Sequence, residues 1–428
     1  MFLSSKGKIL ILAMGDLALF YLGLFFTLNL RYQTLVEPEI WLAHQWPFFW
    51  IHLLWLFIFY IGGAYDVKNF ASYKKILGTT LKTMAIAAMM AVLIFYLAPG
   101  LKIAPKTNLF IDIAVVSILL VLWRRLFWFF IKKVSKIKVL FLGSTKEMRQ
   151  FGEQLKNNPQ LGYEPMTTPE NVQLVVASAD MIQDKEISGK FYQMVLLGIS
   201  VIDFESFYES LTEKVPISII NEGWFLKNVN EINKKPFEQF KRVFDIIYAV
   251  VTGIITLAIL PFIAMFIKLE SKGPVFYKQK RVGKNGKIFE LFKFRTMIKD
   301  AEKNKAQWAS ENDNRITKIG KILRKTRLDE LPQIWNVLKG DLSFIGPRPE
   351  RPEFVEMLKK EIPHYAMRHL VKPGLSGWAQ IKYPYAASVK DAEEKLQYDL
   401  YYIKNRSMVL DLAITAKTIA TIVSRQGR

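Results

Sequence analysis

Four long apolar runs in the first third of the chain constrain its fold more than any other feature. They lie near residues 9–30, 46–64, 83–101 and 107–131. Each is close to the roughly 20 residues that a helix needs to cross a bilayer. The first run is too long for a removable signal peptide, and no small-residue cleavage site follows it. The sequence therefore predicts a membrane protein that begins with a four-helix transmembrane bundle, residues 1–135.

Basic residues between the runs predict how the bundle is oriented. The segments expected on one side of the membrane carry many of them: Lys6, Lys8, Lys68, Lys74, Lys75 and the cluster from Arg124 to Lys138. The loops expected on the other side carry few: Arg31, Lys102 and Lys106. Because cytoplasmic loops are enriched in lysine and arginine, we expect the N-terminus and everything after residue 132 in the cytoplasm.

Two acidic residues, Asp16 and Asp112, lie inside the apolar runs. An ionisable group inside a membrane is costly unless it is paired, so such residues can mark a pathway. Hydrogen bonding between helices explains them equally well, and the sequence assigns them no role.

The amino-acid composition excludes some kinds of site but does not identify the substrate. The formal net charge of +21 is compatible with nucleic acid, anionic lipid or phosphorylated substrates. The absence of cysteine excludes disulfides and thiolate metal sites. Of the four histidines, His364 and His369 are five residues apart and point to different faces of a helix, which argues against a shared metal ion.

Short apolar segments after the bundle predict a Rossmann-like α/β domain with a parallel sheet over residues 136–230. The expected strands are 137–143, 173–178, 193–198 and 217–220. The turn after the first strand reads GSTKEM, which lacks the spaced glycines of a dinucleotide site. This predicts a degenerate domain with a structural or regulatory role. It also removes the main support for an NAD-dependent sugar-modifying enzyme.

The apolar segment 243–270 has the length of a membrane span but basic residues on both flanks, so both ends look cytoplasmic. Pro261 removes a backbone donor and clashes with the preceding turn, which bends a helix. Thr256 or neighbouring helices could satisfy the freed carbonyl. We therefore predict a re-entrant helix broken at Pro261. The alternative, a plain fifth transmembrane helix, would export the phosphate-binding residue types that follow.

The remaining sequence is expected to complete an α+β catalytic domain over residues 231–428. It begins with a β-hairpin around Asn285-Gly286, a pair typical of a type I′ turn. Lys293 and Arg295 are two residues apart, so we expect them on one side of a strand. Two cations on one side suit a diphosphate, and a solvated charged face is the alternative interpretation.

The acidic pair Asp329 and Glu330 is the candidate catalytic centre, at the expected start of a helix. Acids at a helix start also cap free amides and favour the helix dipole, so capping explains the pair as well as catalysis does. Catalysis gains support from the nearby cations Arg324, Lys325, Arg327 and Arg348. Cations beside paired acids suit an Mg²⁺-bound diphosphate, and a carboxylate can itself attack as a nucleophile.

These segments resemble the bacterial sugar transferases, specifically the monotopic polyprenyl-phosphate phosphoglycosyl transferases. The resemblance covers nearly the full length and rests on KRVFDIIYA, GPVFYKQKRVGKNGKIFELFKFRTM, RKTRLDELPQIWNVLKGDLSFIGPRPE and KPGLSGWAQI, in the family's order. The bundle and the Rossmann-like module resemble those of the family's large members. The segment after KPGLSGWAQI is similar to the exopolysaccharide-assembly branch.

The resemblance implies a reaction in two steps. Asp329 would attack the diphosphate of a UDP-sugar, UMP would leave, and undecaprenyl phosphate would take the sugar phosphate from the covalent aspartyl intermediate. Glu330 would help Asp329 to bind Mg²⁺. Arg295, Arg324 and Arg348 match the family's basic positions and would contact phosphates or nucleotide.

The resemblance also implies a setting. The protein would lie in the bacterial inner membrane with its catalytic domain on the cytoplasmic face. Its partners would be a UDP-sugar, undecaprenyl phosphate and membrane lipids but no nucleic acid. A homo-oligomeric state would also be compatible with the resemblance. It would perform the first membrane step of exopolysaccharide, capsule, O-antigen or glycoprotein glycan assembly. The alternative is a catalytically idle membrane scaffold or nucleotide-sugar sensor with the same fold.

Overall fold

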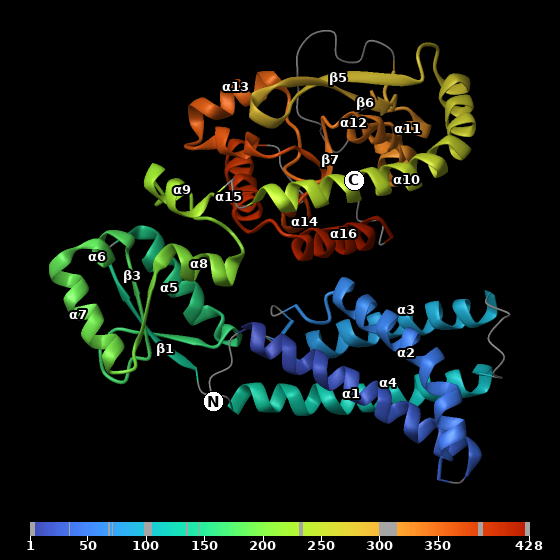
Figure 1. Cartoon of the computed structure of the whole chain (residues 1–428), viewed down its shortest axis with the longest axis horizontal. Coiled ribbons are helices and arrows are strands. Elements are labelled where there is room, and N and C mark those ends of the chain that lie inside the picture. Colours follow the sequence, from blue (N-terminus) through green and yellow to red (C-terminus); the bar gives the residue numbers. More distant parts are fainter. Residues whose placement is uncertain are drawn as a thin grey trace. The chain divides into compact units, whose positions relative to one another are not determined.

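The computed structural model divides into two compact units, Met1–Phe207 and Tyr208–Arg428 (Figure 1). The structure describes residues 5–33, 35–66, 69–70, 72–97, 105–133, 136–143, 145–230, 234–298, 315–383 and 388–423. The first unit contains the predicted bundle and the parallel sheet. The second contains the long apolar segment around Pro261 and the acidic pair.

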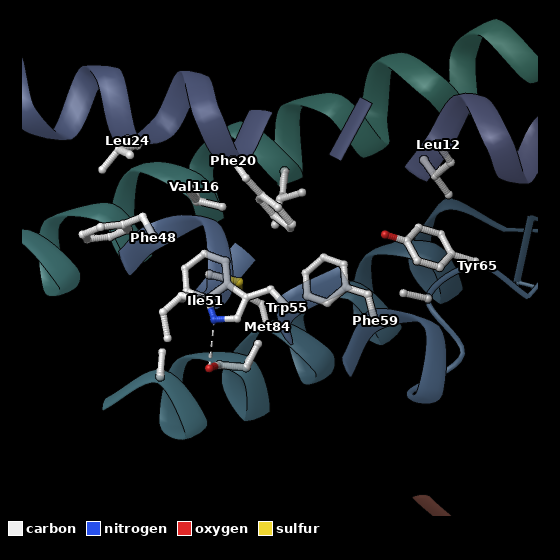
Figure 2. Close-up of a cluster of buried hydrophobic side chains, with 14 of the residues drawn as sticks. Leu12, Phe20, Leu24, Phe48, Ile51, Trp55, Phe59, Tyr65, Met84 and Val116 are labelled. Atoms are coloured by element: carbon white, nitrogen blue, oxygen red, sulfur yellow. Dashed lines mark hydrogen bonds between the residues drawn. The ribbon is translucent and has the colours of Figure 1, made fainter. Parts of the chain in front are cut away.

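Four long helices begin the first unit, as the apolar runs predict: α1 (Ser5–Tyr32), α2 (Pro38–Ile61), α3 (Tyr73–Leu97) and α4 (Pro105–Lys133). Their inward faces bury large apolar side chains, and Figure 2 shows Phe20, Trp55 and Phe59 gathered between the helices. Trp55 donates its indole hydrogen to Ala87 O at 3.1 Å, which satisfies its one polar atom (Figure 2). The predicted four-helix bundle is confirmed.

Within the described part of the chain, four helices are long and apolar enough to cross a membrane: Gly7–Tyr32, Pro38–Ile61, Tyr73–Phe95 and Lys235–Glu270. Three of them belong to the bundle. The fourth bundle helix, α4, is not one of these spans, and it carries Asp112, Arg124 and Arg125. Its outward side chains are nevertheless apolar, since Phe110 is 54% and Ile118 is 62% exposed. Such outward apolar faces are those of a membrane protein.

Arg124 ties three helices together inside the bundle. Its guanidinium contacts the two oxygens of Asp16 at 2.6 and 2.7 Å, and its Nε donates to Thr80 Oγ1 at 2.9 Å. Tyr65 donates its hydroxyl hydrogen to Asp16 at 2.8 Å. All four side chains are buried. Of the two interpretations of Asp16, hydrogen bonding between helices is therefore the one that the structure supports.

We expect Asp16→Asn to destabilise the bundle strongly, because it leaves the buried Arg124 charge without its carboxylate. The expected loss is about 3–5 kcal/mol, and the midpoint of thermal unfolding in detergent measures it. Asp112→Asn is the matched control. Asp112 contacts the Thr27 hydroxyl at 3.3 Å and His52 Nε2 at 3.4 Å, and an amide can still bond with both groups. Equal losses in the two variants would contradict the importance of the Asp16–Arg124 charge pair.

A four-stranded parallel sheet follows the bundle, in the order β2-β1-β3-β4. Its strands are β1 (Ile137–Leu142), β2 (Tyr163–Met166), β3 (Leu174–Ala177) and β4 (Ser200–Asp203). Helices α5 (Lys146–Asn157), α6 (Ala179–Gln183), α7 (Lys185–Leu196) and α8 (Phe204–Thr212) connect and follow them. The predicted α/β architecture with a parallel sheet is confirmed.

Two of the four predicted strands are wrong. Segment 193–198 belongs largely to α7, because Asp184 caps that helix through Glu186 N and Ile187 N and the apolar run continues it. Short apolar runs fit a buried helix as well as a strand. Segment 217–220 forms no strand. The strands β2 and β4 were missed, and each has only four residues.

Residues 208–230, which the sequence assigns to the Rossmann-like domain, pack with the second unit. Val215, Ile217 and Phe225 share a buried core with Val355 and Leu396. Phe225 lies on α9 (Glu222–Asn228). The segment 208–230 therefore belongs to the core of the second unit.

Helix α10 (Lys235–Glu270) is one helix of 36 residues with Pro261 inside it. Figure 1 shows its ribbon bending toward its C-terminal end, as a proline within a helix causes. Thr256 donates to Thr252 O at 2.7 Å and not to the carbonyl of Leu257 that Pro261 leaves free. Ile254 and Leu257 are 65% and 70% exposed, as lipid-facing residues are. A re-entrant path through a membrane stays a prediction.

The predicted β-hairpin is confirmed in detail. β5 (Phe276–Val282) pairs antiparallel with β6 (Ile288–Phe294). In the turn, Asn285 and Gly286 have φ angles of 56° and 76°, and Lys287 N donates to Lys284 O at 3.2 Å. Positive φ at both central residues defines a type I′ turn.

The other elements complete an α+β unit around α10. They are α11 (Lys318–Lys325), α12 (Ile334–Lys339), β7 (Ser343–Ile345), α13 (Pro352–Glu361), η6 (Tyr365–Leu370), β8 (Gly374–Ser376), α14 (Trp378–Lys382), α15 (Val389–Asn405) and α16 (Met408–Val423). Ala249 of α10 packs with Ile334 and Val337 of α12, and Ile263 packs with Leu323 of α11. The long apolar helix is therefore part of the core that supports the acidic pair.

Candidate active site

Asp329 and Glu330 lie in a 3₁₀-helix, Leu328–Gln333, that leads into α12. The predicted helix start is confirmed, although its first turns are 3₁₀ rather than α. The preceding residue, Arg327, has a left-handed backbone with φ 55°. Among the described residues, no backbone N–H donates to either carboxylate, and Arg327 at the N-cap makes no side-chain cap. The capping interpretation of the acidic pair therefore finds no support.

Three cations surround the carboxylate of Glu330. Arg348 Nη2 donates to Oε1 at 2.6 Å, Lys293 Nζ lies 3.5 Å from the same oxygen, and Arg327 Nη1 lies 3.7 Å from Oε2. Burial alone would raise the pKa of Glu330. The charges of Arg348 and Lys293 outweigh burial and hold this pKa well below its usual range. Glu330 is therefore an ionised anchor for the surrounding cations.

Asp329 has the opposite electrostatic environment. Its side chain is buried, with 8% exposed. Burial and, after it, the neighbouring Glu330 charge raise the pKa of Asp329, and Lys293 and Arg324 only partly oppose them. Within the described segments, no side chain forms a hydrogen bond or an ion pair with its carboxylate. Adjacent acids whose pKa values are pushed apart are typical of a site in which the two have different tasks.

The structure brings Lys293 and Arg348 to the acidic pair, as predicted, and places Arg324 near Asp329. Arg324 Nε donates to Thr296 Oγ1 at 2.9 Å, and its charge lowers the pKa of Asp329. Burial lowers the pKa of Lys293, and the Glu330 carboxylate partly compensates. Three of the four predicted substrate-binding residues thus surround the two acids.

Arg295 does not join them, and its expected place beside Lys293 is wrong. Its guanidinium donates to Ser271 O at 2.6 Å and to Lys272 O at 3.2 Å, just after α10. The strand β6 ends at Phe294, so the alternation of side chains does not extend to Arg295. Arg295 instead ties the end of α10 to the hairpin.

The donor set fits Mg²⁺ only together with a substrate. In the described ranges, no group of three histidine, aspartate or glutamate side chains could hold a metal ion. Mg²⁺ is commonly bound by one or two carboxylates, with phosphate oxygens and water as the other ligands. The Asp329 carboxylate suits that role. The Glu330 oxygens already contact cations, so Glu330 would have to exchange one of these contacts to bind a metal.

Lys395, which the sequence did not reveal as a site residue, lies on α15 far along the chain. Burial lowers the pKa of Lys395 to about 8, and the charge of Glu350 opposes this effect while that of Arg348 adds to it. Lys395 is therefore a further cation near the Arg348 loop. No local motif could indicate it, because the fold alone brings α15 to this loop.

Comparison with known proteins identifies the family. Residues 237–425 match the model of the bacterial sugar transferase family. A Bacillus subtilis (strain 168) protein, named a putative undecaprenyl-phosphate N-acetylgalactosaminyl 1-phosphate transferase, is 52% identical over 128 residues, which are 30% of this chain and 72% of that relative. The chain belongs to the bacterial sugar transferase family. This sugar transferase also matches an uncharacterized sugar transferase of the same organism, 41% identical over 187 residues, 44% of this chain and 89% of the relative.

A longer relative extends the match. The UDP-N-acetylgalactosamine-undecaprenyl-phosphate N-acetylgalactosaminephosphotransferase of Aeromonas hydrophila is 42% identical over 251 residues, which are 58% of this chain and 58% of the relative. The sugar transferase family match begins within α10 and includes both acids, Lys293 and Arg348. The bundle and the parallel sheet lie outside it.

Proposed function

We propose that this protein transfers sugar-1-phosphate from a UDP-sugar to undecaprenyl phosphate. The observation that carries the proposal is the acidic pair itself, a buried aspartate with a raised pKa beside a glutamate that three cations hold ionised. Three relatives are named as transferases of N-acetylgalactosamine phosphate, glucose-1-phosphate or galactose phosphate to undecaprenyl phosphate. The coarse reaction class follows from them, and the detailed chemistry below is our proposal.

In the first step, an Asp329 oxygen attacks the phosphorus that carries the sugar. A bond forms between Asp329 and this phosphorus, and the bond to the second phosphate breaks, so that UMP leaves with the bonding electron pair. The raised pKa of Asp329 makes its ionised carboxylate a stronger nucleophile. In the second step, a phosphate oxygen of undecaprenyl phosphate attacks the same phosphorus and releases Asp329.

The cations around Glu330 stabilise the charge of the diphosphate. A guanidinium has five N–H donors, and among the described residues only Glu330 accepts a hydrogen bond from Arg348, so the other donors remain for phosphate oxygens. Lys293 offers a second cation on the same side of the acidic pair. Because these groups are held before substrate arrives, they need little reorganisation during the reaction.

We further propose that Mg²⁺ is bound by Asp329 and Glu330 together with diphosphate oxygens. When bound, the ion would neutralise negative charge on the diphosphate. Glu330 contributes only if the bound diphosphate draws Arg348 or Lys293 away from it.

The membrane placement is also a proposal. Both flanks of α10 are basic, and a soluble nucleotide sugar must reach an acidic pair whose supporting core includes this helix. A re-entrant α10 in the bacterial inner membrane, with the catalytic domain on the cytoplasmic face, satisfies both conditions. Periplasmic labelling of a tag placed after Glu270 would contradict this topology.

A product assay tests the reaction. Purified protein receives undecaprenyl phosphate, Mg²⁺ and a panel of UDP-sugars that includes UDP-N-acetylgalactosamine, UDP-glucose and UDP-galactose. We expect UMP release with at least one sugar. Release of UDP would indicate ordinary glycosyl transfer, and binding without any release would indicate an idle scaffold or sensor.

A further inference from the structure

The loop Pro347–Glu350 carries Arg348, which contacts Glu330. Hydrogen bonds to the backbone carbonyl groups hold this loop in place. Four consecutive carbonyls each accept one hydrogen bond: Pro347 O from Gly374 N at 2.9 Å, Arg348 O from Arg368 Nη2 at 3.0 Å, Pro349 O from Arg281 Nη1 at 3.0 Å and Glu350 O from Val282 N at 2.9 Å. The two prolines have no backbone N–H to contribute. Two of the four donors are guanidinium groups, so side chains rather than regular secondary structure hold half of this loop.

Buried side chains hold the Arg368 guanidinium in place. Its Nε and Nη2 lie 3.1 and 2.7 Å from Asp399 Oδ2, and its Nη1 donates to Tyr365 OH at 2.9 Å. Arg368, Asp399 and Tyr365 are 7%, 2% and 3% exposed. A buried arginine with three defined acceptors has one orientation, and a buried charge of this kind tolerates little movement.

Arg281 holds the other side of the loop. Besides Pro349 O, its guanidinium contacts Gln279 Oε1 at 3.1 Å through Nε and lies 3.6 Å from Glu350 through Nη1. Neither Arg281 nor Arg368 forms a hydrogen bond or an ion pair with Asp329 or Glu330 in the described part of the chain. Both act on the main chain that carries Arg348.

We propose that Arg368, and Arg281 with it, are positioning residues that hold the Arg348 loop so that the Arg348 guanidinium reaches Glu330. This inference rests on the proposed function. The Arg348–Glu330 contact is 2.6 Å, and a shift of about 1 Å would leave no hydrogen bond. Misplacing a catalytic group by about 1 Å can cost roughly 10²-fold in rate.

Arg368→Lys tests the inference, because lysine keeps the charge but cannot bridge the three acceptors. With UDP-N-acetylgalactosamine and undecaprenyl phosphate, we expect kcat to fall about 10-fold with little change in KM.

Arg406→Lys is the matched control. Arg406 is also buried, lies 3.1 Å from Glu238 and donates to Ile403 O at 3.0 Å, away from the loop. We expect it to lower the thermal midpoint without changing kcat. In an Arg348→Gln background, Arg368→Lys should lose most of its effect on kcat, whereas the effect of Arg406→Lys on the thermal midpoint should persist. Equal effects of Arg368→Lys on kcat in both backgrounds would overturn the proposal.

A measurement without substrate separates this inference from the proposed function. The thermal midpoints of Arg348→Gln, Glu330→Gln and their double variant give the coupling between the two side chains. We expect this coupling to shrink in the Arg368→Lys background and to stay unchanged in the Arg406→Lys background. If it stays unchanged in both, the positioning role is wrong whatever sugar is turned over. If Arg368→Lys does not fold, Arg281→Lys enters the same measurement, with the same expected loss of coupling.

Discussion

Asp329→Asn is expected to lower turnover by roughly 10⁴-fold or more, because an amide cannot attack phosphorus as a carboxylate does. The substitution keeps the size of the side chain, so the fold should persist. Intact-protein mass spectrometry after incubation with a UDP-sugar, without undecaprenyl phosphate, should show a sugar-phosphate adduct on the unsubstituted protein and none on the variant.

Asp341→Asn provides the control for this change. Asp341 follows α12 in the same unit, and its charge is not among the causes that shift the pKa of either acid. We expect its adduct and turnover to match those of the unsubstituted protein. An adduct that persists in Asp329→Asn would place the nucleophile elsewhere.

The raised pKa of Asp329 also predicts the direction of the pH dependence. The attacking carboxylate must be ionised, so activity should fall as the pH drops through the raised pKa of Asp329. The midpoint of this fall should lie above the ordinary aspartate value of about 3.9. A pH–rate profile with saturating UDP-sugar measures it.

Glu330→Gln is expected to have the second largest effect on turnover, because it removes the shared partner of Arg348 and Lys293. The loss of stability should be about 3 kcal/mol, at the low end for a buried pair since the Arg348 side chain is 36% exposed. Turnover should fall about 10²-fold as the cations lose their fixed positions. Thermal unfolding and UMP release measure the two effects separately.

The pH dependence of stability distinguishes a charge effect from lost packing. The pKa of Glu330 is lowered in the folded protein, so its stabilising contribution is present above the ordinary glutamate pKa and is lost as the pH falls toward the folded value. The difference in thermal midpoint between the two proteins should therefore shrink on acidification. A difference that is the same at about pH 7 and about pH 2 would point to packing instead.

Local chemistry explains which predictions succeeded. The Asn285-Gly286 turn follows from the backbone freedom of two residues, and the bundle helices follow from apolar length alone. Short sequence motifs also single out the acidic pair and its nearby cations: Asp329, Glu330, Lys293 and Arg348. The amino-acid sequence alone therefore predicts that these four residues lie together, and the structure brings them together, while their roles stay a prediction.

The failures share a dependence on tertiary structure. The apolar run 193–198 fits a buried helix as well as a strand, and in the fold it ends α7, where Met194 packs against the core that includes Val175. The long Arg295 side chain could have pointed either to the acidic pair or to the end of α10. In the fold it donates hydrogen bonds to the carbonyls of Ser271 and Lys272. Arg368 and Lys395 approach the site from η6 and α15, which no spacing in the sequence connects to the acids.

The packing of α10 limits how this protein can be handled. Ala249 of α10 packs in one apolar core with Leu291, Ile334 and Val337. Ile263 and Ile267 of the same helix pack in a second core with Phe294 and Leu323. A shortened version that started after Glu270 to gain solubility in water would expose both of these apolar faces. Activity assays therefore need the intact α10, and detergents or nanodiscs that cover its exposed apolar side chains belong to the assay from its first step.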